Sequence, residues 1–83
     1  ERSARQMRKM MEELGETAGA IAGGDHVKTI DGIGDCVVVL TILAVQRNTT
    51  LEECVMAAWE EIKDRTGRTV DGVFIKDEPA EAS

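Results

Sequence analysis

The chain has 83 residues, which is the size of one small domain whose hydrophobic core supplies little net stability, so we expect a single domain over residues 1–83 that is stabilised by oligomerisation. Ten lysines and arginines stand against 16 aspartates and glutamates, for a net charge of -6. This balance argues against nucleic acid as a partner, because binding to a phosphate backbone needs a basic surface. An acidic chain can still bind phosphates through a metal ion.

Cysteine usage and hydropathy predict the compartment. Cys36 and Cys54 both fall in apolar helical settings without C-x-x-C spacing, and we expect reduced core thiols. The longest apolar run, residues 36–45, is about half of the ~20 residues needed to cross a bilayer, and there is no signal-peptide pattern. We therefore expect a cytoplasmic protein without a membrane partner. Because Glu1 is not a methionine and leads directly into a helical pattern, we also expect an upstream segment.

The first predicted element is an amphipathic helix from Arg2 to Ala22, which the cluster Gly23, Gly24 and Asp25 ends. Within it, Gly15 is unfavourable by about 1 kcal/mol relative to alanine, which indicates a close contact or an approach by a ligand. Its apolar residues recur at spacings of three and four, and they are Met7, Met10, Met11, Leu14, Ala18 and Ile21.

A second helix is predicted from about His26 to Gln46, and it contains the stretch DGIGDCVVVLTILAV at residues 31–45. Gly32 and Gly34 raise the same question of close contact as Gly15. The helix is apolar on nearly all sides, so it must be surrounded by other helices. A chain this short has few helices to cover it, so we expect a second subunit to cover the rest of its apolar surface.

A third helix is predicted after Thr50, which forms a capping box with Glu53, and Gly67 is predicted to end it. Its apolar stripe includes Trp59, interpreted as core rather than as a base-stacking residue. An extended or hairpin-like arm around Asp71-Gly72 follows at residues 68–76, and residues 76–83 are predicted to be a frayed tail. The predicted fold class is all-α: a helical hairpin plus a third helix in an oligomeric bundle, with a short C-terminal arm.

Two groups of carboxylates are the candidate chemistry. Glu12, Glu13 and Glu16 lie within one turn of the first helix, and Asp31 and Asp35 share one face of the second. A tight antiparallel turn would place Glu16 and Asp31 at the same height. Converging carboxylates repel one another unless a cation neutralises them, and all-oxygen ligands select a hard ion such as Mg²⁺, with Mn²⁺ as a substitute. The alternative is a solvated acidic face.

These acids carry a family resemblance. The segment Glu12-Glu13-Leu14-Gly15-Glu16, followed by Ile33-Gly34-Asp35, resembles the metal-binding signature of the MazG-like all-α nucleoside triphosphate pyrophosphohydrolases, and residues 62–77 resemble the C-terminal end of such members. The family signature is E-x-x-E and then E-x-x-D. Glu13, Glu16 and Asp35 match it, whereas Gly32 occupies the position of the third acid. We expect Asp31, or alternatively a water molecule, to replace that acid, and Gly32→Glu to restore part of the activity lost in Asp31→Ala.

The resemblance implies a magnesium-dependent enzyme that hydrolyses nucleoside triphosphates to monophosphates and pyrophosphate. It implies Glu13, Glu16, Asp35 and Asp31 as metal ligands and Glu12 and Glu13 as catalytic residues, with Glu12 orienting water. The candidate phosphate-binding residues are Lys63, Arg65, Arg68 and Lys76, acting across the interface of a dimer or dimer of dimers, or alternatively forming ordinary surface charge. The rival functions are a non-catalytic helical oligomerisation module and a regulator that binds a nucleotide without cleaving it.

Overall fold

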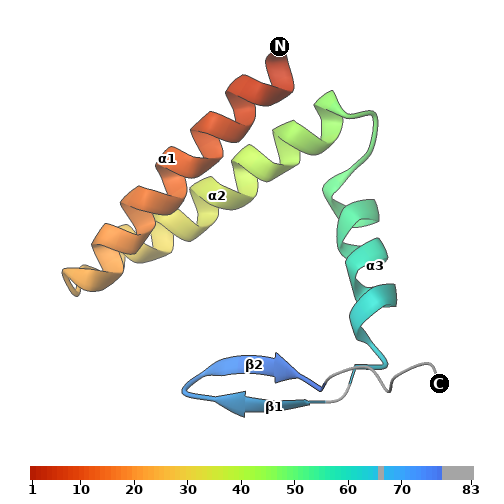
Figure 1. The fold of residues 1–83 in the computed structure, drawn as a ribbon. Coiled ribbons are helices and arrows are strands. Elements are labelled where there is room, and N and C mark those ends of the chain that lie inside the picture. Colours follow the sequence, from red (N-terminus) through yellow and green to blue (C-terminus); the bar gives the residue numbers. More distant parts are fainter. Residues whose placement is uncertain (66, 78–83) are drawn as a thin grey trace.

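The computed structural model describes residues 1–65 and 67–77. Three helices, α1 (Arg2–Ala22), α2 (His26–Gln46) and α3 (Leu51–Ile62), are followed by the short strands β1 (Gly67–Val70) and β2 (Val73–Lys76). Figure 1 shows α1 and α2 as an antiparallel hairpin, with α3 leaving its open end and the two strands lying beyond the far end of α3. The predicted helical hairpin with a third helix is confirmed.

The turn between α1 and α2 forms as the sequence predicts. Gly24 adopts a φ of 70°, a left-handed conformation that favours glycine, and the Asp25 N–H donates to the Ala20 carbonyl at 2.9 Å. The Asp25 carboxylate then accepts from the Lys28 N–H at 3.0 Å and caps α2. This tight turn makes the two helices neighbours along their whole length.

The start of α3 follows the prediction in part. The Thr50 hydroxyl accepts from the Glu53 N–H at 3.1 Å, as an N-cap does. The Glu53 carboxylate accepts from the Thr49 hydroxyl at 2.7 Å. Of the two hydrogen bonds of a capping box, the one accepted by the Thr50 hydroxyl therefore forms. The Glu53 carboxylate binds the Thr49 hydroxyl in place of the Thr50 backbone N–H.

The C-terminal arm is a β-hairpin. Gly67 pairs with Lys76 and Val70 with Val73, and Asp71 and Gly72 form the turn with φ angles of 49° and 79°. Gly67 is thus a strand residue whose missing side chain lets the facing strand approach closely.

One predicted boundary in this region is wrong, because helix α3 ends at Ile62 rather than at Gly67. Lys76, where the predicted arm and the predicted tail overlap, is the last residue of β2 and so belongs to the arm. Thr66 and residues 78–83, which make up most of the predicted tail, lie outside the described residues.

The face of α1 that packs on α2 is not its apolar stripe. The predicted stripe leaves Met11 and Ile21 68% and 62% exposed. The residues of α1 that are buried are Met10, Glu13, Thr17 and Ala20. At 100° per residue, this set is centred about a quarter-turn from the predicted stripe. The helix pair is therefore joined through a face with two polar residues, and the more apolar face is open.

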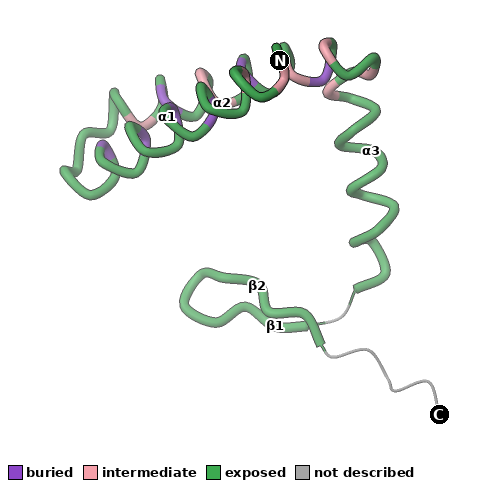
Figure 2. The backbone as a smooth tube through the Cα atoms, turned by 45° about the horizontal axis from the view of Figure 1, so that its top comes forward, coloured by how far each residue is buried: buried purple, intermediate pink, exposed green. Residues whose placement is uncertain are grey.

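Few of the described residues are buried, as Figure 2 shows. Among the described residues, the buried hydrophobic side chains are Met10, Ala20, Val39 and Ala44, and α3 has none. Trp59 is 51% exposed and Cys54 is also exposed. The sequence predicts both to be core residues, and neither is buried within the single chain. Cys36 is partly buried.

The dimensions describe an open molecule. The radius of gyration is 16.2 Å, whereas a compact domain of this length has about 12 Å. The accessible surface is 6894 Å², against about 4,900 Å² expected for a folded monomer of this mass. One chain therefore covers only one side of α2.

By length and composition, α2 is long and apolar enough to cross a membrane, and the described residues contain one such helix. It has 21 residues, a mean hydropathy of 1.6 in its most apolar window, and 11% of that window is buried. The core helix of a helical assembly meets the same criterion. Asp31 and Asp35 lie within α2, and carboxylates are unfavourable in the hydrocarbon region of a bilayer.

Candidate functional site

A groove of about 690 Å³ runs between α1 and α2 toward their connecting turn. Its walls include Glu13 and Glu16 from α1, and Asp31 and Asp35 from α2. Four of the five predicted acids thus line one space, because the antiparallel pairing turns their two helix faces toward each other. Asp25 and Lys28 line the same groove nearer the turn.

A second hollow, of about 410 Å³, lies farther from the turn. Glu13 and Asp35 line it as well, so the two spaces meet at this pair of carboxylates. Gln6 and Lys9 contribute its polar side chains, and Val38, Val39 and Ile42 its apolar wall. The Gln6 side-chain amide donates to the Val39 carbonyl at 3.4 Å and links the two helices.

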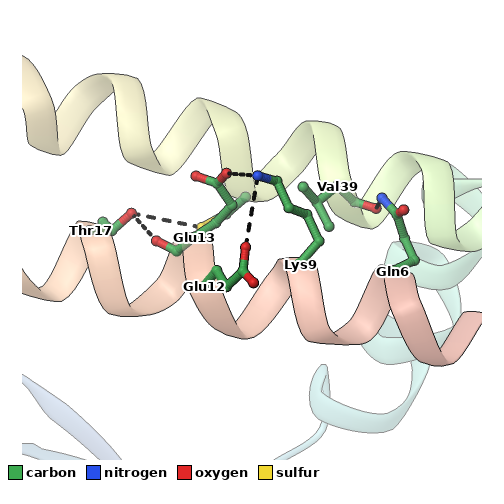
Figure 3. Close-up of polar contacts among 7 residues, drawn as sticks. Gln6, Lys9, Glu12, Glu13, Thr17 and Val39 are labelled. Carbon is green, nitrogen blue, oxygen red and sulfur yellow. Dashed lines mark hydrogen bonds and ion pairs between the residues drawn. The ribbon is translucent and has the colours of Figure 1, made fainter.

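Glu13 is the most enclosed of the acids. It is 8% exposed, and its Oε1 lies 3.3 Å from the Lys9 Nζ (Figure 3). The same ammonium lies 4.0 Å from Oε2 of Glu12. Glu12 is exposed and lines neither hollow, so the predicted water-orienting residue lies on the outer flank of α1.

The charges in the groove interact with one another. The neighbouring Asp31 carboxylate raises the pKa of Asp35, and burial and Glu13 add to this effect, while Lys9 opposes it. The pKa of Lys9 is also raised, by its hydrogen bond to Glu13 and by the charges of Glu13, Glu12 and Glu16. The groove is therefore a site of like-charge repulsion in which Lys9 supplies a positive charge.

The position of the absent third acid is a helix contact. Gly32 is buried, and a Cβ built on it would collide with the Thr17 hydroxyl and lie 3.1 Å from the Thr17 Cβ. Thr17 itself is held by its hydroxyl, which donates to the Glu13 carbonyl at 2.7 Å and lies 3.9 Å from the Cys36 Sγ. A glutamate at position 32 does not fit beside Thr17, so the structure does not support the expected rescue by Gly32→Glu.

The prediction of close contact is correct at only one of the three glycines considered. A Cβ at Gly15 or Gly34 would meet no heavy atom within 4 Å. Gly32 is the position where the two helices require a glycine.

The donor set fits a hard divalent cation by its chemistry. Carboxylate oxygens from both helices line the groove, and Mg²⁺ and Mn²⁺ bind such oxygens. Among residues 1–65 and 67–77, no three His, Cys, Asp or Glu side chains are arranged to hold one ion as they stand. Side-chain rotation is thus required before the carboxylates can share an ion.

The predicted phosphate-binding residues lie elsewhere. Lys63 follows α3 and pairs with Glu60 at 2.8 Å, while Arg68 and Lys76 are exposed on the strands. Among the described elements, the β-hairpin contacts none of the helices. The structure therefore does not bring Lys63, Arg65, Arg68 and Lys76 to the groove within one chain. Lys28 lines the groove and Lys9 lines the smaller hollow beside it.

Lys9 and Thr17 lie at the site but are not among the predicted site residues. A signal was present, since Lys9, Glu13 and Thr17 follow at intervals of four and lie in one row along α1. The stronger apolar periodicity on the neighbouring face obscured it.

Comparison with known proteins gives no relative: no family model, no curated protein and no solved structure matches this chain.

Proposed function

We propose that the protein is a magnesium-dependent nucleoside triphosphate pyrophosphohydrolase of the cytoplasm, which releases a monophosphate and pyrophosphate. The observation that supports this most directly is the single groove lined by Glu13, Glu16, Asp31 and Asp35. Three of these match the signature acids in the sequence, and the groove lies between the two helices that carry the motif.

In this proposal the four carboxylates hold Mg²⁺, or Mn²⁺ in its place. The bound ion supplies charge neutralisation at the phosphate oxygens. A carboxylate oxygen of Glu13 accepts the proton of the attacking water, whose oxygen bonds to the α-phosphorus as the bond from that phosphorus to the bridging oxygen breaks. Glu12 reaches this water only after a rotation from the outer flank of α1.

The phosphate-binding residues come from a second copy in this proposal. The groove is acidic, and none of the basic residues Lys63, Arg65, Arg68 and Lys76 lines it within one chain. Each chain has about 2,000 Å² more surface than a compact monomer of its mass, and a standard interface uses about 800 Å² per partner. A dimer or a dimer of dimers accounts for both observations.

The test is to incubate the protein with Mg²⁺ and a panel of ribo- and deoxynucleoside triphosphates while measuring monophosphate and pyrophosphate. We expect both products in equal amounts and loss of activity with a chelator. Release of inorganic phosphate and a nucleoside diphosphate instead, or no turnover of any nucleotide, would overturn the proposal.

A second candidate is a non-catalytic helical oligomerisation module or a nucleotide-binding regulator. The exposed apolar faces favour it, because they serve assembly whether or not the groove is catalytic. Nucleotide binding without turnover would indicate the regulator. An oligomer that neither binds nor cleaves nucleotides would indicate the module.

A further inference from the structure

We propose that Lys9 is a built-in counter-ion that holds Glu13 in the metal-free protein and must release it when a divalent cation enters the groove. This inference rests on the proposed function and concerns the regulation of the same site.

The first step is the enclosure of Glu13. Among the described residues it is the buried carboxylate, and Lys9 is the cation within ion-pair distance of it, at 3.3 Å. A buried carboxylate without a positive partner is strongly unfavourable. The position of Glu13 against α2 therefore depends on Lys9 as long as no metal ion is bound.

The second step is competition for one oxygen. The Lys9 ammonium contacts Glu13 Oε1 from the side of the smaller hollow, at the point where the two hollows meet. An ammonium and a divalent cation that bind the same carboxylate repel each other, so occupancy by one weakens the other.

The third step is the alternative position of Lys9. Its side chain is 53% exposed, and Glu12 Oε2 lies 4.0 Å from its Nζ on the solvent side. Because Glu12 is three residues away on the same helix, a rotation of the long lysine side chain transfers the ammonium from Glu13 to Glu12 without any change in the backbone. This gives Glu12 a role on the outer flank, where it receives the displaced lysine.

The two effects of removing Lys9 have opposite directions. Lys9→Met leaves Glu13 unpaired, which lowers the melting temperature of the metal-free protein. The same change removes the competitor and should tighten Mg²⁺ binding roughly two- to fivefold, the ratio expected from a partly exposed ion pair. A residue that only supports the structure would weaken metal binding when it is replaced.

The experiment is calorimetric titration of the metal-free protein with MgCl₂ and then MnCl₂ at pH 8 without nucleotide, combined with thermal unfolding. Arg8→Met is the matched control, because Arg8 is an exposed neighbour that lines neither hollow. We expect Lys9→Met to bind metal more tightly than Arg8→Met and to unfold at a lower temperature without metal. Lys9→Arg keeps the charge and should restore the parent's behaviour.

A second measurement follows Lys9 in the unaltered protein. Its ammonium is paired with the Glu13 carboxylate at 3.3 Å, so the amine should react slowly with acetic anhydride until metal releases it. We expect acetylation at Lys9 to accelerate with Mg²⁺ while Lys63, which is paired far from the groove, is unchanged.

The outcomes separate the two proposals. If the parent binds neither ion, the proposed function is wrong, and the metal competition with it. If the parent binds metal but Lys9→Met binds it no more tightly than Arg8→Met, the role of Lys9 is wrong and the proposed function stands. Unchanged acetylation at Lys9 in a metal-saturated parent would likewise overturn only the release of Lys9.

Discussion

Two regions of the molecule are held together by different interactions. They are the helical hairpin of α1 and α2, and the region formed by α3 and the β-hairpin. The first is held by side chains that meet across the pair, such as Thr17 against Gly32 and Gln6 on the Val39 carbonyl. The second has no buried residue in its helix or its strands. Its shape comes from local signals, namely the Thr50 cap and the Asp71-Gly72 turn.

This difference indicates where each part acts. The helical hairpin holds the carboxylates in one groove, so its geometry is set within one chain. The second region presents Trp59, Phe74 and the basic side chains to its surroundings, and an isolated two-stranded hairpin is at best marginally stable in water. Its exposed surface is what a second copy would bind in the proposed assembly.

The largest expected effect concerns assembly. Light scattering should find at least a dimer at micromolar concentration, and Ile33→Glu should raise the dissociation constant by about 100-fold or more, since an uncompensated buried carboxylate destabilises by several kcal/mol. Ile33 lies on the open side of α2 and is 55% exposed. Arg5→Glu, on the polar side of α1, is the control. A folded parent monomer at this concentration would show that the exposed faces need no partner.

The next effect is on turnover. Asp35→Asn should lower pyrophosphate release by about 100-fold or more, since several kcal/mol of charge stabilisation at the phosphates would be lost. Asp64→Asn makes the same change in the second region, after α3, and should leave turnover unaltered. Near-parental activity in Asp35→Asn would mean that the groove acids do not serve the reaction.

Two glycines two positions apart in α2 differ in their surroundings: Gly32 lies at the contact with α1, and Gly34 faces open space. Gly32→Ala should destabilise the protein by about 1–3 kcal/mol, because its Cβ would overlap Thr17. Gly34→Ala enters open space and should stabilise the helix by about 0.5–1 kcal/mol. Urea unfolding measures both. Equal stability of the two variants would contradict the close approach of α1 and α2.

The second region depends on its cap. Thr50→Ala should lower the free energy of unfolding by about 1 kcal/mol, since the Glu53 N–H loses its acceptor. Thr41→Ala is the matched change in α2, where the exposed hydroxyl bonds only to the Val37 carbonyl of its own helix, and it should have little effect. If the two variants behaved alike, the start of α3 would be set by contacts other than its cap.

The smallest expected effect is a dependence of the stability of the metal-free protein on pH. The folded-state pKa of Asp35 is raised above its ordinary value of 3.8, so protonation favours the folded state. The stability that the protonated group contributes is complete below 3.8 and is lost as pH rises through the raised pKa. Metal-free melting temperatures should therefore fall across this window, and Asp35→Asn should flatten that part of the profile. If the melting temperature of the variant depended on pH as the parent's does, the charge of Asp31 would not affect the titration of Asp35.

The limits of the first two helices and the start of the third follow from short-range chemistry, which a sequence displays directly. Gly24 and Asp25 end one helix and cap the next, Thr50 caps the third, and Asp71-Gly72 fits a tight hairpin turn. The shared groove of Glu16 and Asp31 was also predictable, because a short turn and a fixed rise per residue set their heights. The end of α3 was not, because Gly67 is compatible with either a helix stop or a strand.

Only the tertiary structure decided which face of α1 meets α2. Helical periodicity shows that Met7, Met11 and Leu14 share a side, but it does not show what that side packs against. The contact instead passes through Glu13 and Thr17, because Gly32 allows α2 to approach the threonine closely. That choice buries Glu13 beside Lys9 and leaves the apolar side of α1 open, so the same packing decision determines both the charge balance of the groove and the exposed surface of the chain.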